Sequence, residues 1–457
     1  MTDLEKNPKK KEMDLLINII YYALFKKELL DYTHFSLPSS FGVFVTIRRT
    51  NILSSWPKDI HGCIGYWTNN FTLLSNKELY TQLCKVSYDA MYSDDRRKYF
   101  SLIETDPLSV LEIDFMQLPI IPLDNKGNFL NSQKKFNNKT HGIIIKSNGN
   151  RATYLPNVFE NMSWSDMIVS IKNKAGITTN KFDLFAYKIK QIKAPLISLL
   201  QNNILASHHY DTFYTFLINS ADLSKRFPFI YHITDTGNEI WNKDETVRNI
   251  STMANVLYYI QQKKVKQKID KRIEEHLLKN INSIIANIKK YDSQALSFLG
   301  YYITLNKSAF CKKLSQDILS ADKEFAVPEI AIGLLKAQCK TNQVPDRIRI
   351  NDSIFHMNWV LQHQYVYGMK TTSTELQYVI KKIKKILKKE TNYLAVAFEG
   401  LCAVYKSTKD MSALITAFEV FYNIEKRINM QWLYAFFDGS ARIDITEHML
   451  HGFQLLR

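Results

Sequence analysis

The sequence predicts an α+β domain with an antiparallel sheet over residues 1–200, followed by an all-helical domain over residues 201–457. Length supports two domains, because 457 residues, 46% of them hydrophobic, can bury more than one core. Strand-like runs rich in β-branched and aromatic residues occur only before about residue 195. After about residue 205, amphipathic segments with the helical period follow one another without such runs.

The first domain opens with a predicted helix, since the apolar run Leu15 to Phe25 is too short to span a bilayer and continues as an amphipathic segment. Helices are also predicted at LYTQLCKVSYDAMYS and at SWSDMIVSIKNKAGI, the second with Ser163 as its N-cap and Gly176 at its end. The predicted strands are GVFVTIRR (42–49), SVLEIDFMQL (109–118) and HGIIIKSNGNRATYL (141–155), the last interrupted by the hairpin signal SNGN.

The second domain is predicted to consist of helical hairpins, because small residues recur where helices would pack, as in QALSFLGYYITL and YLAVAFEGLCAVY. An open superhelix and a closed ring of hairpins, an α/α toroid, both satisfy this pattern. The predicted helices are 245–262, 267–289, 293–305, 308–320, 327–340, 353–367, 374–389, 394–406, 412–427 and 445–456.

Composition limits the classes of function. The formal net charge of +16 is spread over both halves of a chain that is also rich in Asn, Ile, Tyr and Phe, so it gives little support to nucleic-acid binding. The five cysteines are odd in number and contain no C-x-x-C pair, which argues against a disulfide framework and a zinc site. We expect a cytoplasmic protein in a reducing compartment, with no metal and no other cofactor.

The segment DIHGCIGYW holds the first candidate site, since Gly62 and Gly65 bracket Cys63 in a chain with only 14 glycines. Bare backbone would let a substrate approach, and its amides would stabilise an oxyanion, so both glycines are candidate substrate-binding residues. A catalytic thiol needs a basic neighbour, for which His61, on the same strand face as Cys63, and His141 are the candidates. The alternative is a buried small residue required by sheet packing.

Five segments, in this order, resemble the AMMECR domain family over roughly residues 13–195. They are FGVFVTIRR, IHGCIGYW, SVLEIDFMQLPIIP, THGIIIKSNGNRATYLPNV and WSDMIVSIKNKAGI. The resemblance implies a compact α+β fold with an antiparallel sheet, to which no reaction is securely attached. It also implies a metabolite- or peptide-modifying system, because such domains accompany a Memo-like protein and a radical SAM enzyme in many microbes, and these are the expected partners.

Comparison with the family pattern qualifies individual residues. His61 stands where the family usually has arginine, so a phosphate- or carboxylate-binding role of that arginine does not carry over to this chain. Glu112 and Lys174 occupy family-like positions. Glu112 is a candidate to orient a histidine or accept a substrate proton, and Lys174 is a candidate to bind an anionic group. For both residues, a structural ion pair is the alternative.

The helical domain loosely resembles α/α toroids, in which aromatic and carboxylate side chains gather at one mouth to bind sugars. Candidate substrate-binding residues follow from that resemblance and from helical spacing, with packing between helices as the alternative. They are Trp241, Glu245 and Arg248 at the start of one helix, His356, Trp359 and His363 at i, i+3 and i+7, and Asp444 with His448 at i and i+4.

Two functions are compatible with these observations, and a third is less favoured. The first is an enzyme or enzyme subunit that acts on a sugar-like or peptide-like metabolite with Cys63 as nucleophile. The second is a non-catalytic binding or scaffold protein whose helices present a surface to a partner. The third is nucleic-acid binding, for which a steep fall of affinity with salt would be the signature.

Overall fold

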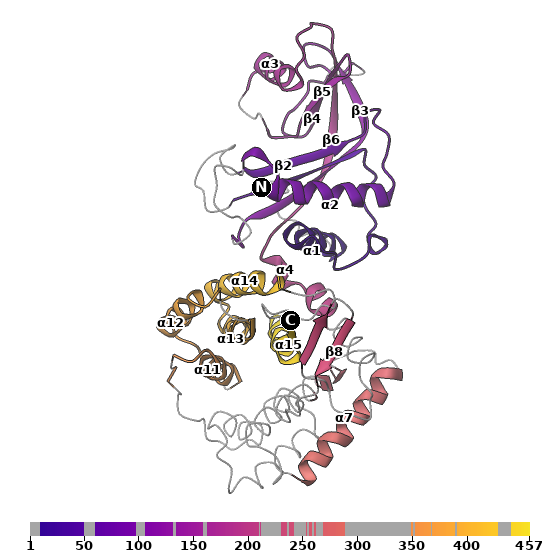
Figure 1. Cartoon of the computed structure of the whole chain (residues 1–457). Helices are drawn as coiled ribbons and strands as arrows, with labels where there is room; N and C mark the ends of the chain where they lie inside the picture. Colours follow the sequence, from indigo (N-terminus) through magenta and orange to yellow (C-terminus); the bar gives the residue numbers. More distant parts are fainter. Residues whose placement is uncertain are drawn as a thin grey trace. The chain divides into compact units, whose positions relative to one another are not determined.

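The chain divides into an N-terminal unit, Met1–Leu199, and a C-terminal unit, Leu200–Arg457, in a computed structural model (Figure 1). The structure describes residues 10–49, 60–96, 106–130, 134–158, 162–209, 211, 230–234, 237–241, 253, 256–257, 260–261, 268–287, 349–350, 352–366, 368–388, 391–427 and 440–457.

The N-terminal unit contains a six-stranded sheet in the order β2-β1-β3-β6-β4-β5, with every neighbouring pair antiparallel. The predicted antiparallel α+β class is therefore confirmed. The sequence patterns did not single out the sixth strand, in which lysines alternate with apolar residues. The strands are β1 (Gly42–Arg48), β2 (Ile60–Trp67), β3 (Val110–Leu123), β4 (Gly142–Ser147), β5 (Asn150–Tyr154) and β6 (Asp183–Pro195).

The described helices of this unit include α1 (Lys10–Phe25), α2 (Asn76–Tyr92) and α3 (Trp164–Ala175), and a short 3₁₀ turn, η1 (Tyr32–His34), follows α1. Local chemistry favours the observed ends of α2 and α3. Ser75 and Glu78 form a capping box at the start of α2. Ser163 caps α3, and Gly176 ends it with a φ of 65°, as the sequence predicted.

The two faces of the sheet have different coverings. α2 packs against β1 and β2 on the face where Val43, Val45 and Ile47 are fully buried. The β4–β5 hairpin turns through Asn148 and Gly149, whose φ angles of 46° and 84° match a two-residue turn and confirm the predicted hairpin. α3 packs on this hairpin, so that the outward side chains of β4 and β5 are also buried.

The sheet is strongly curled, as a contact between its two edge strands, β2 and β5, shows. Arg151 in β5 donates a hydrogen bond from Nη2 to the carbonyl oxygen of Trp67 in β2 at 3.3 Å, and its guanidinium lies 4.1 Å from the centre of the Trp67 ring. In a flat sheet, five strand spacings would separate these edges by about 24 Å. We call the concave side the inner face. It carries the side chains of Trp67 in β2 and Arg151 in β5, of every second residue along these strands, and of the residues paired with them across the sheet. Cys63 is one of these residues.

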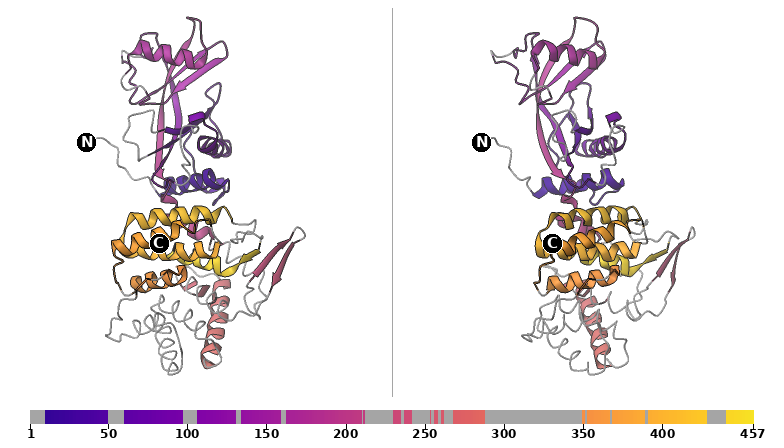
Figure 2. Two further views of the ribbon diagram at one scale, coloured as in Figure 1. Left: turned by 60° about the vertical axis from the view of Figure 1, so that its left-hand side comes forward. Right: turned by 90° about the vertical axis from the view of Figure 1, so that its left-hand side faces the viewer.

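The C-terminal unit is mostly helical in its described part, as predicted. α13 packs against α11, α14 and α15, and Figure 2 shows these helices running side by side. α13 and α15 are buried on nearly all sides, which is typical of central helices. Its described helices are α7 (Lys268–Ala286), α11 (Ile354–Val366), α12 (Ser373–Lys384), α13 (Thr391–Thr408), α14 (Met411–Glu425) and α15 (Ile443–Leu456), while α4 (Ser198–Gln201) crosses the boundary between the two units.

This unit also contains a small antiparallel sheet that the sequence patterns did not predict. Its order is β8-β7-β9, formed by β7 (Ile230–Thr234), β8 (Gly237–Trp241) and β9 (Ser440–Arg442). The predicted helices at 293–305, 308–320 and 327–340 lie outside the described residues, so the choice between ring and superhelix stays a prediction. Among the described residues, no helix combines the length and the apolar character needed to cross a membrane.

Candidate functional site

Cys63 belongs to a row of side chains that crosses four strands on the inner face. Cys63 in β2 lies opposite Thr46 in β1, which lies opposite Glu112 in β3, which lies opposite Lys193 in β6. Directly opposed residues of antiparallel strands point to the same face, so these four side chains are neighbours. The hydroxyl of Thr46, a residue only 2% exposed, donates a hydrogen bond to the Cys63 sulfur at 3.1 Å.

Asp114 lies in the next row of the inner face, and sequence reasoning missed it. It is opposite Phe44 in β1 and Gln191 in β6, and only 3% of the residue is exposed. The Gln191 side-chain amide donates to Asp114 Oδ1 at 2.8 Å. Burial raises the pKa of Asp114 to about 7, and the charge of Glu112 adds to the rise. A carboxyl that is half ionised near neutral pH is suited to proton transfer.

The stabilising effect of Asp114→Asn is expected to increase as the pH rises. Because the folded pKa of about 7 exceeds the ordinary value of 3.8, the contribution of the protonated carboxyl is complete below about pH 4 and is lost as the pH rises to 7. The amide of the Asp114→Asn variant does not ionise, so the variant does not lose stability in this way. Its stability advantage over the wild type in urea unfolding should therefore be larger at pH 8 than at pH 5 by roughly 2 kcal/mol. An equal advantage at both pH values would contradict the buried, titrating carboxyl.

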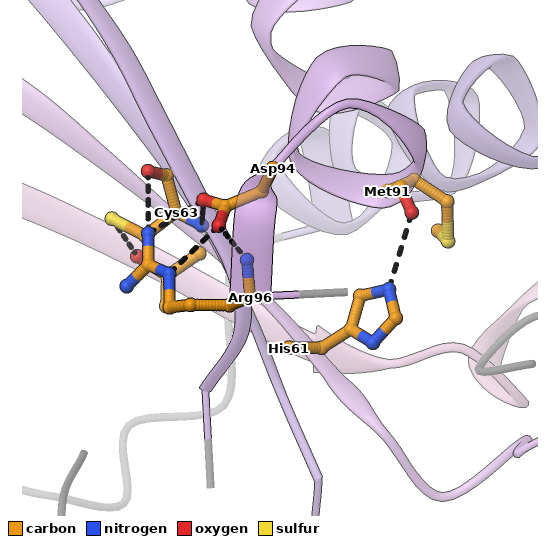
Figure 3. Close-up of polar contacts among 6 residues, drawn as sticks. His61, Cys63, Met91, Asp94 and Arg96 are labelled. Carbon is orange, nitrogen blue, oxygen red and sulfur yellow. Dashed lines mark hydrogen bonds and ion pairs between the residues drawn. The ribbon is translucent and has the colours of Figure 1, made fainter. Parts of the chain in front are cut away.

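Strand β2 lies at an edge of the sheet, where no further strand among the described residues pairs with it. Asp94 and Arg96 bond to backbone groups of β2 at this edge. The Cys63 amide donates to Asp94 Oδ2 at 2.9 Å, and Arg96 Nη2 donates to the Cys63 carbonyl oxygen at 3.0 Å (Figure 3). Arg96 also donates two side-chain hydrogen bonds to the Asp94 carboxylate, of 2.8 Å from Nε and 2.6 Å from Nη2. The amide of Cys63 is thus bonded to a carboxylate, which occupies the position that a substrate oxyanion would need.

Gly62 and Gly65 both make room for packed neighbours. A Cβ atom on Gly62 would lie 1.9 Å from the carbonyl oxygen of Ala90 in α2, and one on Gly65 would lie 2.2 Å from the ring of Phe44. Packing against the α2 backbone therefore requires glycine at position 62, and packing against the Phe44 ring favours it at position 65. Binding of a substrate by these two residues stays a prediction.

His61 does not lie beside Cys63, although strict strand alternation places the two on one face. The β1–β2 register shifts so that Ile47 pairs with Gly62 and Arg48 with Ile60, which leaves His61 as the extra residue of a bulge. Its Nε2 donates to the carbonyl oxygen of Met91 in α2 at 3.1 Å, directed away from Cys63 in Figure 3. His61 is fully buried, and the bulge explains why alternation failed here.

The other predicted residues of this unit have separate surroundings. His141 precedes β4, where its ring contacts Phe129 and Phe136 and its Nδ1 lies 2.8 Å from the hydroxyl oxygen of Thr140. Burial and a nearby lysine lower the pKa of His141. Glu112 accepts a hydrogen bond from Arg48 Nε at 2.8 Å. This ion pair matches the structural alternative for Glu112, within the same row as Cys63.

Lys174 reaches the inner-face region from the end of α3. Its ammonium donates to the carbonyl oxygen of Thr153 in β5 at 3.0 Å and lies 4.6 Å from the centre of the Tyr154 ring. Although the residue as a whole is exposed, burial of the ammonium lowers its pKa, and the charge of Cys63 raises it. The structure therefore brings Lys174 and Cys63 within electrostatic range, which their separation in the sequence did not reveal.

Opposing influences act on the Cys63 thiol, which belongs to a partly exposed residue. Burial of the sulfur raises its pKa, whereas the Thr46 hydrogen bond and the charges of Arg96 and Lys174 lower it, and the charge of Asp114 raises it. The net pKa is raised above the ordinary value of 9.0, so the resting thiol is protonated at neutral pH. Formation of the thiolate depends on the two cations and on the charge of Asp114.

The predicted residues of the helical half fall on different elements. Trp241 ends strand β8 and does not open a helix, while Glu245 and Arg248 lie outside the described residues. His356 and Trp359 are partly buried residues of α11, and burial lowers the pKa of His356. The remaining candidates are His363 in α11 and Asp444 in α15, whose side chains are outside the described set, and His448 in α15, which bonds to Glu399.

Residues 13–194 match the family model AMMECR1. No curated protein matches the chain. Among solved structures, the chain is similar to the crystal structure of an uncharacterized protein from Pyrococcus horikoshii, with 18% identity over 40% of this chain and 90% of that one, and a TM-score of 0.32.

Proposed function

With an AMMECR1 domain at residues 13–194 as the premise, we propose that the chain is an enzyme or an enzyme subunit whose reacting group is the Cys63 thiol. The observation that carries this proposal is the environment of the sulfur. It accepts a hydrogen bond from Thr46 and lies within electrostatic range of Arg96 and Lys174, in a residue that is partly exposed although its sulfur is buried. Reactive cysteines are typically found in such partly exposed, electropositive surroundings.

The chemistry that these residues support is nucleophilic attack by the thiolate on a carbonyl carbon, in which the C–S bond forms as the carbonyl π bond breaks and its electron pair moves to the oxygen. Thr46, Arg96 and Lys174 stabilise the thiolate, and the two cations also favour a substrate that carries an anionic group. Asp114, with a pKa of about 7, is the inner-face carboxyl that gains or loses a proton at working pH. A sugar-like or peptide-like metabolite is the proposed substrate class. A Memo-like protein or a radical SAM enzyme is the proposed partner in a reducing cytoplasm.

Alkylation of Cys63 by iodoacetamide tests the proposal. Asp114→Asn removes a negative charge that raises the thiol pKa, so it should speed labelling at pH 7.5 by about three- to tenfold. Lys174→Met removes a positive charge that lowers the pKa, so it should slow labelling by a similar factor. Peptide mass spectrometry reads each cysteine separately.

Two other cysteines of the same chain are internal controls. Cys84 and Cys402 are buried, and burial raises the pKa of Cys84 to about 12 and that of Cys402 well above its usual value. They should be labelled only when the protein unfolds. If Cys63 is labelled as slowly as these two, or if neither charge variant changes its labelling rate, then the role of Cys63 as a nucleophile is excluded. The non-catalytic binding or scaffold function then becomes the better explanation.

A further inference from the structure

The C-terminal unit contains a buried carboxylate that is bonded to two imidazoles. Glu399 in the middle of α13 is 3% exposed. Its Oε2 accepts hydrogen bonds from His448 Nδ1 at 2.8 Å and from Asn358 Nδ2 at 2.8 Å, and its Oε1 accepts a short one from His451 Nδ1. Three helices, α11, α13 and α15, therefore converge on one carboxylate.

Glycines bring these three helices close together around Glu399. A Cβ atom on Gly400 in α13 would lie 3.0 Å from the side-chain oxygen of Asn358, and one on Gly452 in α15 would lie 2.6 Å from the ring of Phe398. Each glycine flanks a member of the cluster, since Gly400 follows Glu399 and Gly452 follows His451. The close approach of the backbones fixes both histidines on a single acceptor.

Packing alone does not require such a cluster. An isolated buried carboxylate is costly, whereas hydrogen bonds and the two imidazoles here lower the pKa of Glu399 to about 2 despite its burial. Glu399 is thus ionised at neutral pH. Apolar residues of similar volume commonly stabilise a protein as well as a buried ionic group does. Perturbed ionisable clusters of this kind are more typical of functional sites than of cores.

The two histidines are not equivalent. The side chain of His451 is 1% exposed, whereas that of His448 is 16% exposed. Because Glu399 holds His448 by Nδ1, the opposite ring nitrogen, Nε2, is the one through which a proton would be exchanged. A carboxylate that orients an imidazole by Nδ1 and leaves proton transfer to Nε2 is the arrangement of a general base in hydrolytic enzymes.

We infer that Glu399, His448 and His451 form a second proton-transfer site, in which His448 is the general base for a hydroxyl group or water and Glu399 is its positioning residue. The site is independent of the Cys63 proposal. His451 and Asn358 hold the carboxylate in place from its other sides. Among the described residues, Cys402, one turn along α13, is a further titratable group near the cluster, since the charge of Glu399 raises the pKa of its thiol; Glu447 is also buried on α15.

Acylation of the full chain with diethyl pyrocarbonate, read by peptide mass spectrometry, tests this site. The reagent attacks only neutral imidazole, and the Glu399 charge favours the charged form of His448. In Glu399→Gln, which removes that charge, the pH midpoint for labelling of His448 should therefore fall, and labelling at pH 6 should speed up by about tenfold. His34, an exposed histidine of the same chain, is the control whose labelling the substitution should leave unchanged. Asn358→Ala frees the carboxylate from one donor, so it should raise the midpoint for His448 above that of the wild type.

Hydrolysis of 4-nitrophenyl acetate supplies a second readout. In a Cys63→Ser background, which removes the other nucleophile, His448→Gln should abolish hydrolysis above that of free imidazole groups, with a pH profile that follows the labelling midpoint. Labelling of His448 only on unfolding, a labelling midpoint that Glu399→Gln leaves unchanged, or hydrolysis unchanged by His448→Gln would each overturn the inference. The Cys63 proposal is read on a different peptide, so either can fail alone.

Discussion

Gly62→Ala is expected to cause a large loss of stability in the N-terminal unit. The added Cβ atom would lie 1.9 Å from the carbonyl oxygen of Ala90 and 2.9 Å from its carbonyl carbon. Both are backbone atoms of α2, so no side-chain rotation relieves the clash, and the helix must move away from β2. We expect a decrease of about 3 kcal/mol in the free energy of unfolding, measured by urea denaturation.

The displacement also has a consequence for the candidate site. Asp94, which follows α2, bonds to the Cys63 amide and would move with the helix. Labelling of Cys63 should therefore change together with stability in Gly62→Ala. Tyr66→Phe, at a position on the same strand that is 38% exposed, is the matched control and should change stability by less than about 0.5 kcal/mol. Equal stability of Gly62→Ala and the wild type would show that α2 does not pack on Gly62 as described.

Glu399→Ala is expected to have the largest effect in the C-terminal unit. Removal of the carboxylate leaves the donors of Asn358, His448 and His451 without their shared acceptor in a buried place and opens a cavity. Breaking a buried ionic cluster on one side costs about 3–5 kcal/mol, and we expect about 4 kcal/mol here. Thermal and urea unfolding at pH 7 measure the loss.

The pH dependence of this effect has a definite sign. The folded pKa of Glu399, about 2, lies below its ordinary value of 4.5, so its contribution is complete above pH 4.5 and is lost as the pH falls toward 2. The difference between wild type and Glu399→Ala should therefore shrink with acidification over that window. Glu419→Ala, which breaks a looser 3.8 Å pair with Lys384, is the control and should cost less than about 1 kcal/mol. A pH-independent difference would contradict an ionised, buried Glu399.

Local chemistry explains why much of the fold was predictable. Ser163 and Gly176 bound α3 because a hydroxyl satisfies free amides at a helix start and glycine adopts the left-handed conformation at its end. Asn148-Gly149 specifies the β4–β5 turn for the same conformational reason. The small β7–β8–β9 sheet escaped prediction because its third strand, β9, is three residues long and pairs across about two hundred residues of chain.

The candidate site was only partly predictable. Cys63 could be singled out because two glycines flank it in a glycine-poor chain. Asp114 could not, because a carboxylate in a strand is ordinarily solvent-facing, and only the curl of the sheet buries its side chain. Glu399 did carry a signal, a single charge inside the apolar run YLAVAFEGLCAV, but its histidine partners lie about fifty residues away.

The sequence by itself determined the two structural classes, the ends of α3, the β4–β5 turn and the choice of Cys63 as the candidate thiol, because each depends on residues close together in the chain. Tertiary structure alone decided which groups surround that thiol. A one-residue bulge turned His61 toward α2, and the curl of the sheet brought Lys174 and Asp114 within electrostatic range of Cys63. Register and curvature arise from contacts between distant segments, and no local pattern encodes them.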